Sequence, residues 1–137
     1  KDEKNWELII SLGGKLSTDA FTDLPKNVHV FKWVPQLYLL SKIDCSINHG
    51  GIHTINECIS NKVPMLIYSG KKYDQNGNAA RIAYHGLGLM GDKDLDTSED
   101  IHSKIDNILK DTSFNEKMIA IYSIYKSYDV KKISSYL

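Results

Sequence analysis

The feature that most constrains the fold is the regular alternation of short apolar runs with segments of helical periodicity. The apolar runs are bounded by Gly, Pro, Asn or Asp, as strands usually are, and lie at 7–12, 28–33, 45–48, 65–68 and 87–90. Segments with helical spacing of apolar residues lie at 35–41, 51–61, 76–85, 99–110 and 115–136. Strands that alternate with helices are typical of a parallel sheet flanked by helices. The sequence therefore predicts an α/β fold with a Rossmann-like parallel sheet.

The length of 137 residues predicts one hydrophobic core and hence a single domain over residues 1–137. No repeat and no Pro-rich or Ser-rich linker divides the sequence. The chain opens with KDEKNWELIISLGG, has no initiator methionine and enters its first predicted strand almost at once. We therefore expect a fragment of a longer protein.

Composition and charge narrow the classes of function. Hydrophobic residues make up 42% and charged residues 25% of the chain, which is typical of a folded, soluble domain. Basic and acidic residues balance at 17 each, and Arg81 is the single arginine, so no basic surface for a nucleic acid is predicted. The longest apolar runs, such as 63–68, are far shorter than the ~20 residues of a membrane span. Neither a nucleic-acid partner nor a transmembrane segment is expected.

The number and placement of the cysteines indicate the redox state of the compartment in which the protein works. Cys45 lies in a predicted strand and Cys58 on a predicted helix, a placement that predicts neither a disulfide framework nor a thiolate metal site. We expect reduced, buried thiols in a cytoplasmic protein.

The segments that follow the first four predicted strands are unusually polar or rich in glycine. They read GGK, VPQ, HGGIHT and SGKKYDQNGN. Ligands of open α/β sheets bind beyond the carboxyl ends of the strands, where helix N-termini begin. On a helix that begins near Gly50, one stripe is polar and consists of Gly50, His53, Thr54 and Glu57. The opposite stripe is apolar, is expected to pack on the sheet, and consists of Ile52, Ile55 and Ile59.

The polar stripe has the chemistry of a nucleotide site. Gly50 and Gly51 allow a ligand close to the backbone, and the free N–H groups of the first helical turn favour a phosphate. Thr54 adds a hydroxyl donor, and a carboxylate one turn further on, at Glu57, can accept hydrogen bonds from ribose hydroxyls. An imidazole N–H of His49 or His53 can reach the same phosphate.

Two other interpretations stay open for this segment. A glycine turn before an amphipathic helix is common and needs no ligand. His49 and His53 also have the spacing of metal ligands on one helix face. The zinc-protease pattern, however, has a glutamate directly after the first histidine, where this chain has Gly50.

Four blocks of this sequence together resemble the donor-binding signature of the UDP-glycosyltransferases. They are WVPQ at 33–36, HGG at 49–51 with Thr54 and Glu57, VP at 63–64, and DQNGNAAR at 74–81. The spacing of 16 between Trp33 and His49 is closest to the bacterial macrolide glycosyltransferase branch. The resemblance covers residues 6–88 and implies the C-terminal, donor-binding half of a GT-B fold enzyme.

The resemblance implies a role for each matching residue. Trp33 is expected to stack on the nucleotide base, the backbone of Val34 to read the base edge, and Gln36 to lie near the base and ribose. His49 is expected to touch the diphosphate and Glu57 to bind the ribose.

Further positions match the phosphate and the sugar. Gly50 belongs to the same HGG block, and Gly51 and Thr54 match phosphate-binding positions. Asp74 and Gln75 match the acid and amide that grip the sugar hydroxyls. The sequence departs from the family at His53, where a small residue or asparagine is usual, and at Lys62, where a glycine is usual.

The sequence thus predicts the donor-binding domain of an inverting glycosyltransferase that transfers a hexose from a UDP- or dTDP-sugar to a small-molecule or lipid acceptor. The resemblance implies no cofactor and no metal. It implies a catalytic base in an N-terminal acceptor domain of the same enzyme, and binding without turnover by this domain alone. Two alternatives remain: a non-catalytic nucleotide-sugar-binding module that completes or regulates a partner protein, and a GT-B fold isomerase or hydrolase.

Two C-terminal features have structural interpretations. The aspartates of GDKDLDTSED resemble a metal loop, but the spacing of Thr97 and Asp100 favours a helix cap beside a solvated acidic loop. On the last predicted helix, Phe114 and Met118 are expected to pack inward, while the end with Tyr125 and Tyr128 is expected to be exposed.

Overall fold

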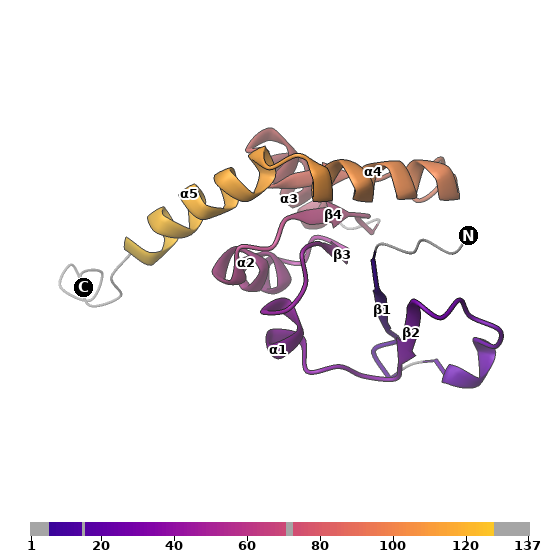
Figure 1. Ribbon diagram of the computed structural model, residues 1–137. Helices are drawn as coiled ribbons and strands as arrows, with labels where there is room; N and C mark the ends of the chain where they lie inside the picture. The colour runs from indigo at the N-terminus through magenta and orange to yellow at the C-terminus, as the bar shows by residue number, and fades with distance from the viewer. Residues whose placement is uncertain (1–5, 15, 71–72, 128–137) are drawn as a thin grey trace. The chain divides into compact units, whose positions relative to one another are not determined.

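The computed structural model describes residues 6–14, 16–70 and 73–127 and has the predicted α/β class (Figure 1). The chain forms two compact units, Lys1–Leu39 and Leu40–Leu137, each of which has a parallel sheet. The single-domain assignment stays a prediction.

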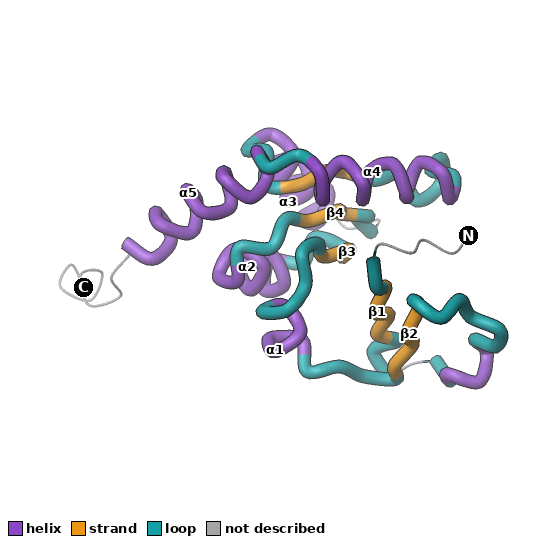
Figure 2. The backbone as a smooth tube through the Cα atoms, viewed as in Figure 1, coloured by secondary structure: helices purple, strands orange, loops and turns teal. Residues whose placement is uncertain are grey.

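The first unit is built on two short parallel strands (Figure 2). Strand β1 (Leu8–Ser11) pairs with β2 (Val28–Phe31), with Leu8 opposite Val28. The connection between them contains a 3-10 helix, η1 (Thr18–Ala20), which the apolar pattern did not predict. None of the described residues of this unit, 6–14 and 16–39, is buried.

The second unit is built on a parallel sheet with the strand order β3-β4-β5. The strands are β3 (Ser46–Asn48), β4 (Met65–Ile67) and β5 (Gly88–Met90). All of β4 is buried, as expected for a central parallel strand covered on both faces. The helices are α2 (Ile52–Asn61), α3 (Tyr73–Tyr84), α4 (Ser98–Lys110) and α5 (Ser113–Ser127).

The main core lies on one face of this sheet. It joins Met65 and Ile67 with buried residues of α2, α3 and α5, among them Ile59, Ile82 and Met118. Leu40, the last residue of the short helix α1 (Gln36–Leu40), belongs to the same cluster. Because side chains alternate along a strand, Leu66 points to the other face, where α4 packs against β4 and β5. Figure 1 shows α2 and α4 on opposite sides of β4.

The structure corrects the apolar stripe of α2 at one position. Ile55 and Ile59 are buried as predicted, but Ile52 is 53% exposed. Ile52 is the first residue of the helix, and helical side chains point toward the N-terminus, so its side chain projects past the packed turns.

Helix α3 begins earlier than predicted. It starts at Tyr73, so Asp74 and Gln75 lie in its first turn and not in the loop before it. The signal was weak, because Asn76 and Gly77 inside the helix are poor helix formers.

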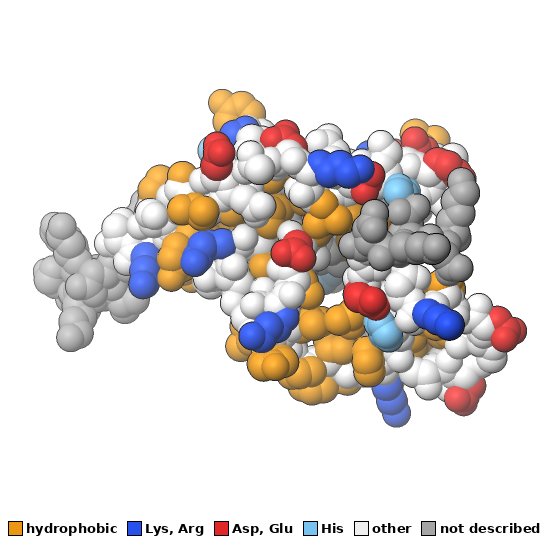
Figure 3. Space-filling model, viewed as in Figure 1, with side chains coloured by type: hydrophobic (Ala, Val, Ile, Leu, Met, Phe, Trp, Pro, Cys, Tyr) orange, Lys and Arg blue, Asp and Glu red, His pale blue; other side chains and the backbone are white. Residues whose placement is uncertain are grey.

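The last helix agrees with its prediction over the described residues. Phe114 and Met118 are buried, and Tyr125 is 46% exposed. Figure 3 shows hydrophobic side chains at the surface along α5. Tyr128 and the predicted continuation of the helix to residue 136 lie outside the described residues.

Candidate functional site

The turn between β3 and α2 is fixed by backbone geometry that only glycine adopts easily. Gly50 has φ +80°, and its N–H donates to Asn48 Oδ1 at 2.9 Å. A Cβ at Gly50 would lie 3.0 Å from Ile67 Cγ2 and 3.2 Å from the carbonyl oxygen of Gln75. Close approach by β4 and by the start of α3 therefore requires a glycine here.

Helix α2 begins without a side-chain cap. Its N-cap is Gly51, and the first intrahelical hydrogen bond runs from Ile55 N to the Gly51 carbonyl at 3.0 Å. The N–H groups of Ile52 and His53 precede that bond and have no intrahelical acceptor. The first turn carries no acidic residue, so no carboxylate there offsets the positive partial charge at this end of the helix dipole. This turn is suited to an anion.

The imidazole of His49 lies over Gly51. A Cβ built on Gly51 would come within 2.7 Å of His49 Nε2. The ring is exposed and occupies the space that a side chain at the N-cap would fill. His49 thus lies at the start of α2, where the family resemblance places a diphosphate contact.

The remaining predicted residues of α2 differ in exposure. Thr54 and Glu57 are half-buried, and His53 is exposed. Thr54 belongs to the first turn of the helix, and Glu57 follows three residues later on the same face. The order of hydroxyl and carboxylate along the helix is the one that the phosphate and ribose prediction requires.

The two residues predicted to bind the sugar lie in the first turn of α3 and differ in exposure. Asp74 is exposed, whereas Gln75 is only 9% exposed and its Oε1 accepts a hydrogen bond from Gly70 N at 2.9 Å. The Gln75 side chain therefore orders the turn after β4. Its predicted sugar contact, like that of Asp74, stays a prediction.

A hydrogen bond joins α3 to the glycine turn before α2. Asn78 Nδ2 donates to the Gly50 carbonyl at 3.0 Å. Asn78 lies four residues after Asp74, so the two share one face of α3. Together with the approach of Gln75 to Gly50, this bond shows that the segments after β3 and β4 meet. The sequence analysis gave neither Asn48 nor Asn78 a role. Two signals were available: Asn48 lies two residues before Gly50, and Asn78 lies four residues after Asp74.

The three other predicted residues belong to the first unit. Trp33 is 70% exposed, Val34 is half-buried, and Gln36 is exposed at the first position of α1. Their convergence with the residues around α2 stays a prediction.

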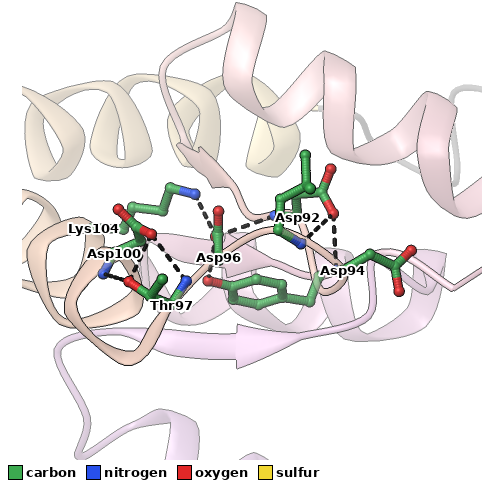
Figure 4. A network of polar contacts seen from close by, with 8 residues as sticks. Asp92, Asp94, Asp96, Thr97, Asp100 and Lys104 are labelled. Carbon is green, nitrogen blue, oxygen red and sulfur yellow. Dashed lines mark hydrogen bonds and ion pairs between the residues drawn. The ribbon is translucent and has the colours of Figure 1, made fainter.

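The acidic segment before α4 is held by hydrogen bonds. Thr97 and Asp100 form a capping box, which confirms the predicted helix cap. Asp92 Oδ1 accepts from the N–H groups of Asp94 at 2.9 Å and Leu95 at 3.2 Å. Asp96 departs from the prediction of a solvated loop, because its side chain is only 11% exposed and pairs with Lys104 (Figure 4).

The two thiols are unsuited to nucleophilic catalysis and to metal binding. Cys45 and Cys58 are free, and desolvation by burial is the main cause that raises the pKa of the Cys45 thiol to about 12 and of the Cys58 thiol to about 11. Both stay protonated at neutral pH and are poor nucleophiles and metal ligands.

The described residues hold no group of three or more His, Cys, Asp and Glu side chains that could bind a metal ion. In the same part of the chain, no helix combines the length and apolar character that crossing a membrane requires.

The parallel sheet of the second unit, the glycine turn and the uncapped helix define a Rossmann-like α/β domain of the class found in GT-B glycosyltransferases. Residues 3–123 match the family described as "Erythromycin biosynthesis protein CIII-like, C-terminal domain". The chain belongs to this family. The resemblance to macrolide and UDP-glycosyltransferases, drawn above from sequence blocks, is therefore confirmed.

Known relatives carry glycosyltransferase names. The chain is 28% identical over 109 residues to NDP-glycosyltransferase YjiC of Bacillus subtilis (strain 168), covering 80% of the chain and 28% of that protein. It is 33% identical over 114 residues to UDP-glucuronosyltransferase 1A6 of Oryctolagus cuniculus, covering 82% of the chain and 21% of that protein. The chain thus spans less than a third of the length of these relatives.

A solved structure shows the same fold. Glycosyltransferase VinC in complex with DTDP superimposes with a TM-score of 0.86 and 22% identity, covering 98% of the chain and 34% of VinC. At this identity the likeness establishes the fold alone.

Proposed function

We propose that this chain is the donor-binding domain of an inverting glycosyltransferase, metal-independent and cytoplasmic, that transfers a hexose from a UDP- or dTDP-sugar to a small-molecule or lipid acceptor. The observation that carries the proposal is the uncapped start of α2 beside a turn held by α3. The N–H groups of Ile52 and His53, the His49 ring over Gly51 and the Thr54 hydroxyl offer donors of hydrogen bonds in one place. A diphosphate is the group that such donors match best.

The ligand's other parts follow from the residues around this point. Glu57 lies one turn further along α2 and accepts hydrogen bonds from the ribose hydroxyls. Asp74, at the start of α3, accepts hydrogen bonds from the sugar hydroxyls. For the base, the sequence resemblance implies Trp33, with Val34 and Gln36, and stacking on an aromatic face contributes about 1–3 kcal/mol per base. Two similar proteins support the choice of bases: UDP-glucuronosyltransferase 1A6 by its name, and glycosyltransferase VinC by its structure in complex with DTDP.

In the complete enzyme, a general base outside this chain deprotonates the acceptor hydroxyl, which attacks the anomeric carbon as the nucleoside diphosphate leaves. Negative charge develops on the diphosphate as the bond breaks. The N–H groups at the start of α2 and the donors of His49 and Thr54 stabilise that charge, while Asp74 and Gln75 orient the sugar. The chain alone is expected to bind the donor and not to turn it over.

The test is calorimetric titration of the 137-residue chain with UDP, dTDP, UDP-glucose and dTDP-glucose. We expect binding of the nucleotides, weakened about tenfold by Thr54→Ala and by Glu57→Ala, because each loses a hydrogen bond to a charged or hydroxyl-rich ligand. Thr22→Ala and Glu116→Ala change the same residue types at exposed positions outside α2 and serve as controls. Absence of binding at millimolar ligand, or equal affinities for site and control variants, contradicts the proposal.

A further inference from the structure

We propose that Asn78 is a positioning residue for the diphosphate: its amide holds the Gly50 carbonyl and thereby fixes the turn from which α2 presents its N–H groups. The inference rests on the proposed function and adds to it a residue that does not touch the ligand. Asn78 lies in the middle of α3, whereas the phosphate donors lie on α2.

The turn is held from both sides by asparagine side chains. Asn48 Oδ1 accepts from the Gly50 N–H at 2.9 Å, and Asn78 Nδ2 donates to the Gly50 carbonyl at 3.0 Å. Asn48 is itself fixed, because its Nδ2 donates to Ser46 Oγ at 3.2 Å. Both polar groups of the Gly50 backbone are therefore engaged by side chains.

Gly50 needs this support because glycine has the widest conformational freedom. Its φ of +80° belongs to a region that it leaves easily, and Gly51, the next residue, is the N-cap of α2. A rotation of the peptide between Gly50 and Gly51 would redirect the Gly51 N–H and move the start of the helix. With the Gly50 carbonyl bound to Asn78, that rotation breaks a half-buried hydrogen bond.

Asn78 also sets the distance between the two halves of the proposed donor site. It shares a face of α3 with Asp74, the residue proposed to bind the sugar. A bond from this face to Gly50 keeps Asp74 in a fixed relation to the phosphate turn. Removing it should therefore weaken binding of a nucleotide sugar at least as much as binding of the nucleotide alone.

The chain offers a matched control in the same helix. Asn76 is also an asparagine of α3, but it is exposed and bonds to Ser69 rather than to Gly50. We compare Asn78→Leu with Asn76→Leu, and Asn78→Asp with Asn76→Asp. Each pair makes the same change of charge and size two residues apart, and the aspartate variants nearly preserve the shape of asparagine should leucine impair folding.

Three quantities are measured for each variant: the free energy of unfolding, the affinity for UDP and UDP-glucose by calorimetry, and the amide NMR signals of Gly50 and Gly51 without ligand. We expect the Asn78 variants to bind UDP about three- to tenfold more weakly than the Asn76 variants under conditions where all are folded. We also expect the Gly50 and Gly51 signals to shift in the Asn78 variants alone. A purely structural role would lower the free energy of unfolding and leave the affinity of the folded chain unchanged.

The outcomes separate this inference from the function on which it rests. Wild-type affinity in the Asn78 variants, or equal losses at Asn76 and Asn78, overturns the positioning role while the proposed function stands. If the wild-type chain binds none of the nucleotides, the proposed function fails and the role of Asn78 in diphosphate binding falls with it.

Discussion

The hydroxyl of Tyr68 donates a hydrogen bond to Asp96 Oδ2 at 2.7 Å and so joins the residue after β4 to the loop before α4. The same carboxylate pairs with Lys104 of α4. The Tyr68 ring lies against Gly91, where an added Cβ would be 2.1 Å from two ring carbons. Tyr68 N donates to the Asn48 carbonyl at 2.9 Å, so the backbone of Tyr68 is bonded to the strand that leads into the glycine turn.

Replacing Tyr68 with Phe is expected to destabilise the chain by about 1 kcal/mol, because the ring keeps its packing while one hydrogen bond to a carboxylate is lost. Tyr84→Phe is the control, since Tyr84 is 86% exposed and its ring contact with His85 needs no hydroxyl. Urea denaturation measures both. Equal stability of the two variants would show that the bond from Tyr68 contributes nothing.

Acid should weaken the contacts that the Asp96 carboxylate makes with Lys104 and Tyr68. The hydrogen bond from Lys104, followed by that from Tyr68, holds the pKa of Asp96 below its ordinary value of 3.8. Because the folded pKa is the lower one, the stabilisation is complete above pH 3.8 and is lost as the pH falls through the folded value. The free energy of unfolding of Asp96→Asn should therefore fall less than that of the wild type between about pH 6 and about pH 3. Asp94→Asn, at an exposed position of the same loop, is the control for the loss of one carboxylate.

Alanine should have opposite effects at two glycines of the second unit. At Gly50, a side chain must adopt φ +80° and meet Ile67 and Gln75, so Gly50→Ala is expected to cost at least 1–2 kcal/mol and to weaken UDP binding. At Gly77, inside α3, an added Cβ meets nothing within 4 Å, so Gly77→Ala should stabilise the chain by about 1 kcal/mol. Thermal denaturation with and without UDP compares them. A neutral Gly50→Ala would refute the close approach of α3 to the turn.

The sequence predicted the order of strands and helices well because each strand has its own apolar run and each helix its own period. It was less accurate where a local signal was weak or misleading. Helix α3 starts at Tyr73 although Asn and Gly favour turns, and Ile52 is exposed although it continues the apolar stripe. The division into two compact units left no mark in composition, since Leu39 and Leu40 are part of one short helix.

The candidate site was predictable only as far as its residues could contact a ligand. His49, Gly51, Thr54 and Glu57 stand out because their chemistry matches a nucleotide at helical spacing. Asn78 acts on another part of the protein, and its bond to Gly50 joins residues 28 positions apart. The spacing of Asn78 after Asp74 indicates only a shared helix face, whereas the bond to Gly50 depends on how α3 packs and has no signal in the local sequence.

Lys62 occupies a position where the sequence blocks led us to expect glycine, and the structure shows the physical cost. It ends α2 with φ +59°, a left-handed conformation that costs a residue with a side chain about 1–2 kcal/mol. Its Nζ lies 4.9 Å from the centre of the Tyr122 ring, a cation–π contact of about 0.5–1 kcal/mol at an exposed site. Lys62→Gly should therefore stabilise the chain more in a Tyr122→Leu background than in the wild type. A double-mutant cycle with no coupling would contradict the contact.

The last prediction separates stability from binding at one residue. Gly51 is the N-cap of α2 and has φ −68°, so a serine fits the backbone and can cap the free N–H groups. Its Cβ would also displace the His49 ring, since Nε2 lies 2.7 Å from that position. Gly51→Ser should raise the free energy of unfolding by a few tenths of a kcal/mol, because serine caps helices only slightly better than glycine. The same variant should bind UDP at least about tenfold more weakly, because its hydroxyl occupies the donors that the phosphate needs.

Denaturation and calorimetry on one preparation of Gly51→Ser test the expected gain in stability and the expected loss of affinity. Undiminished affinity would mean that the start of α2 is not where the phosphate binds.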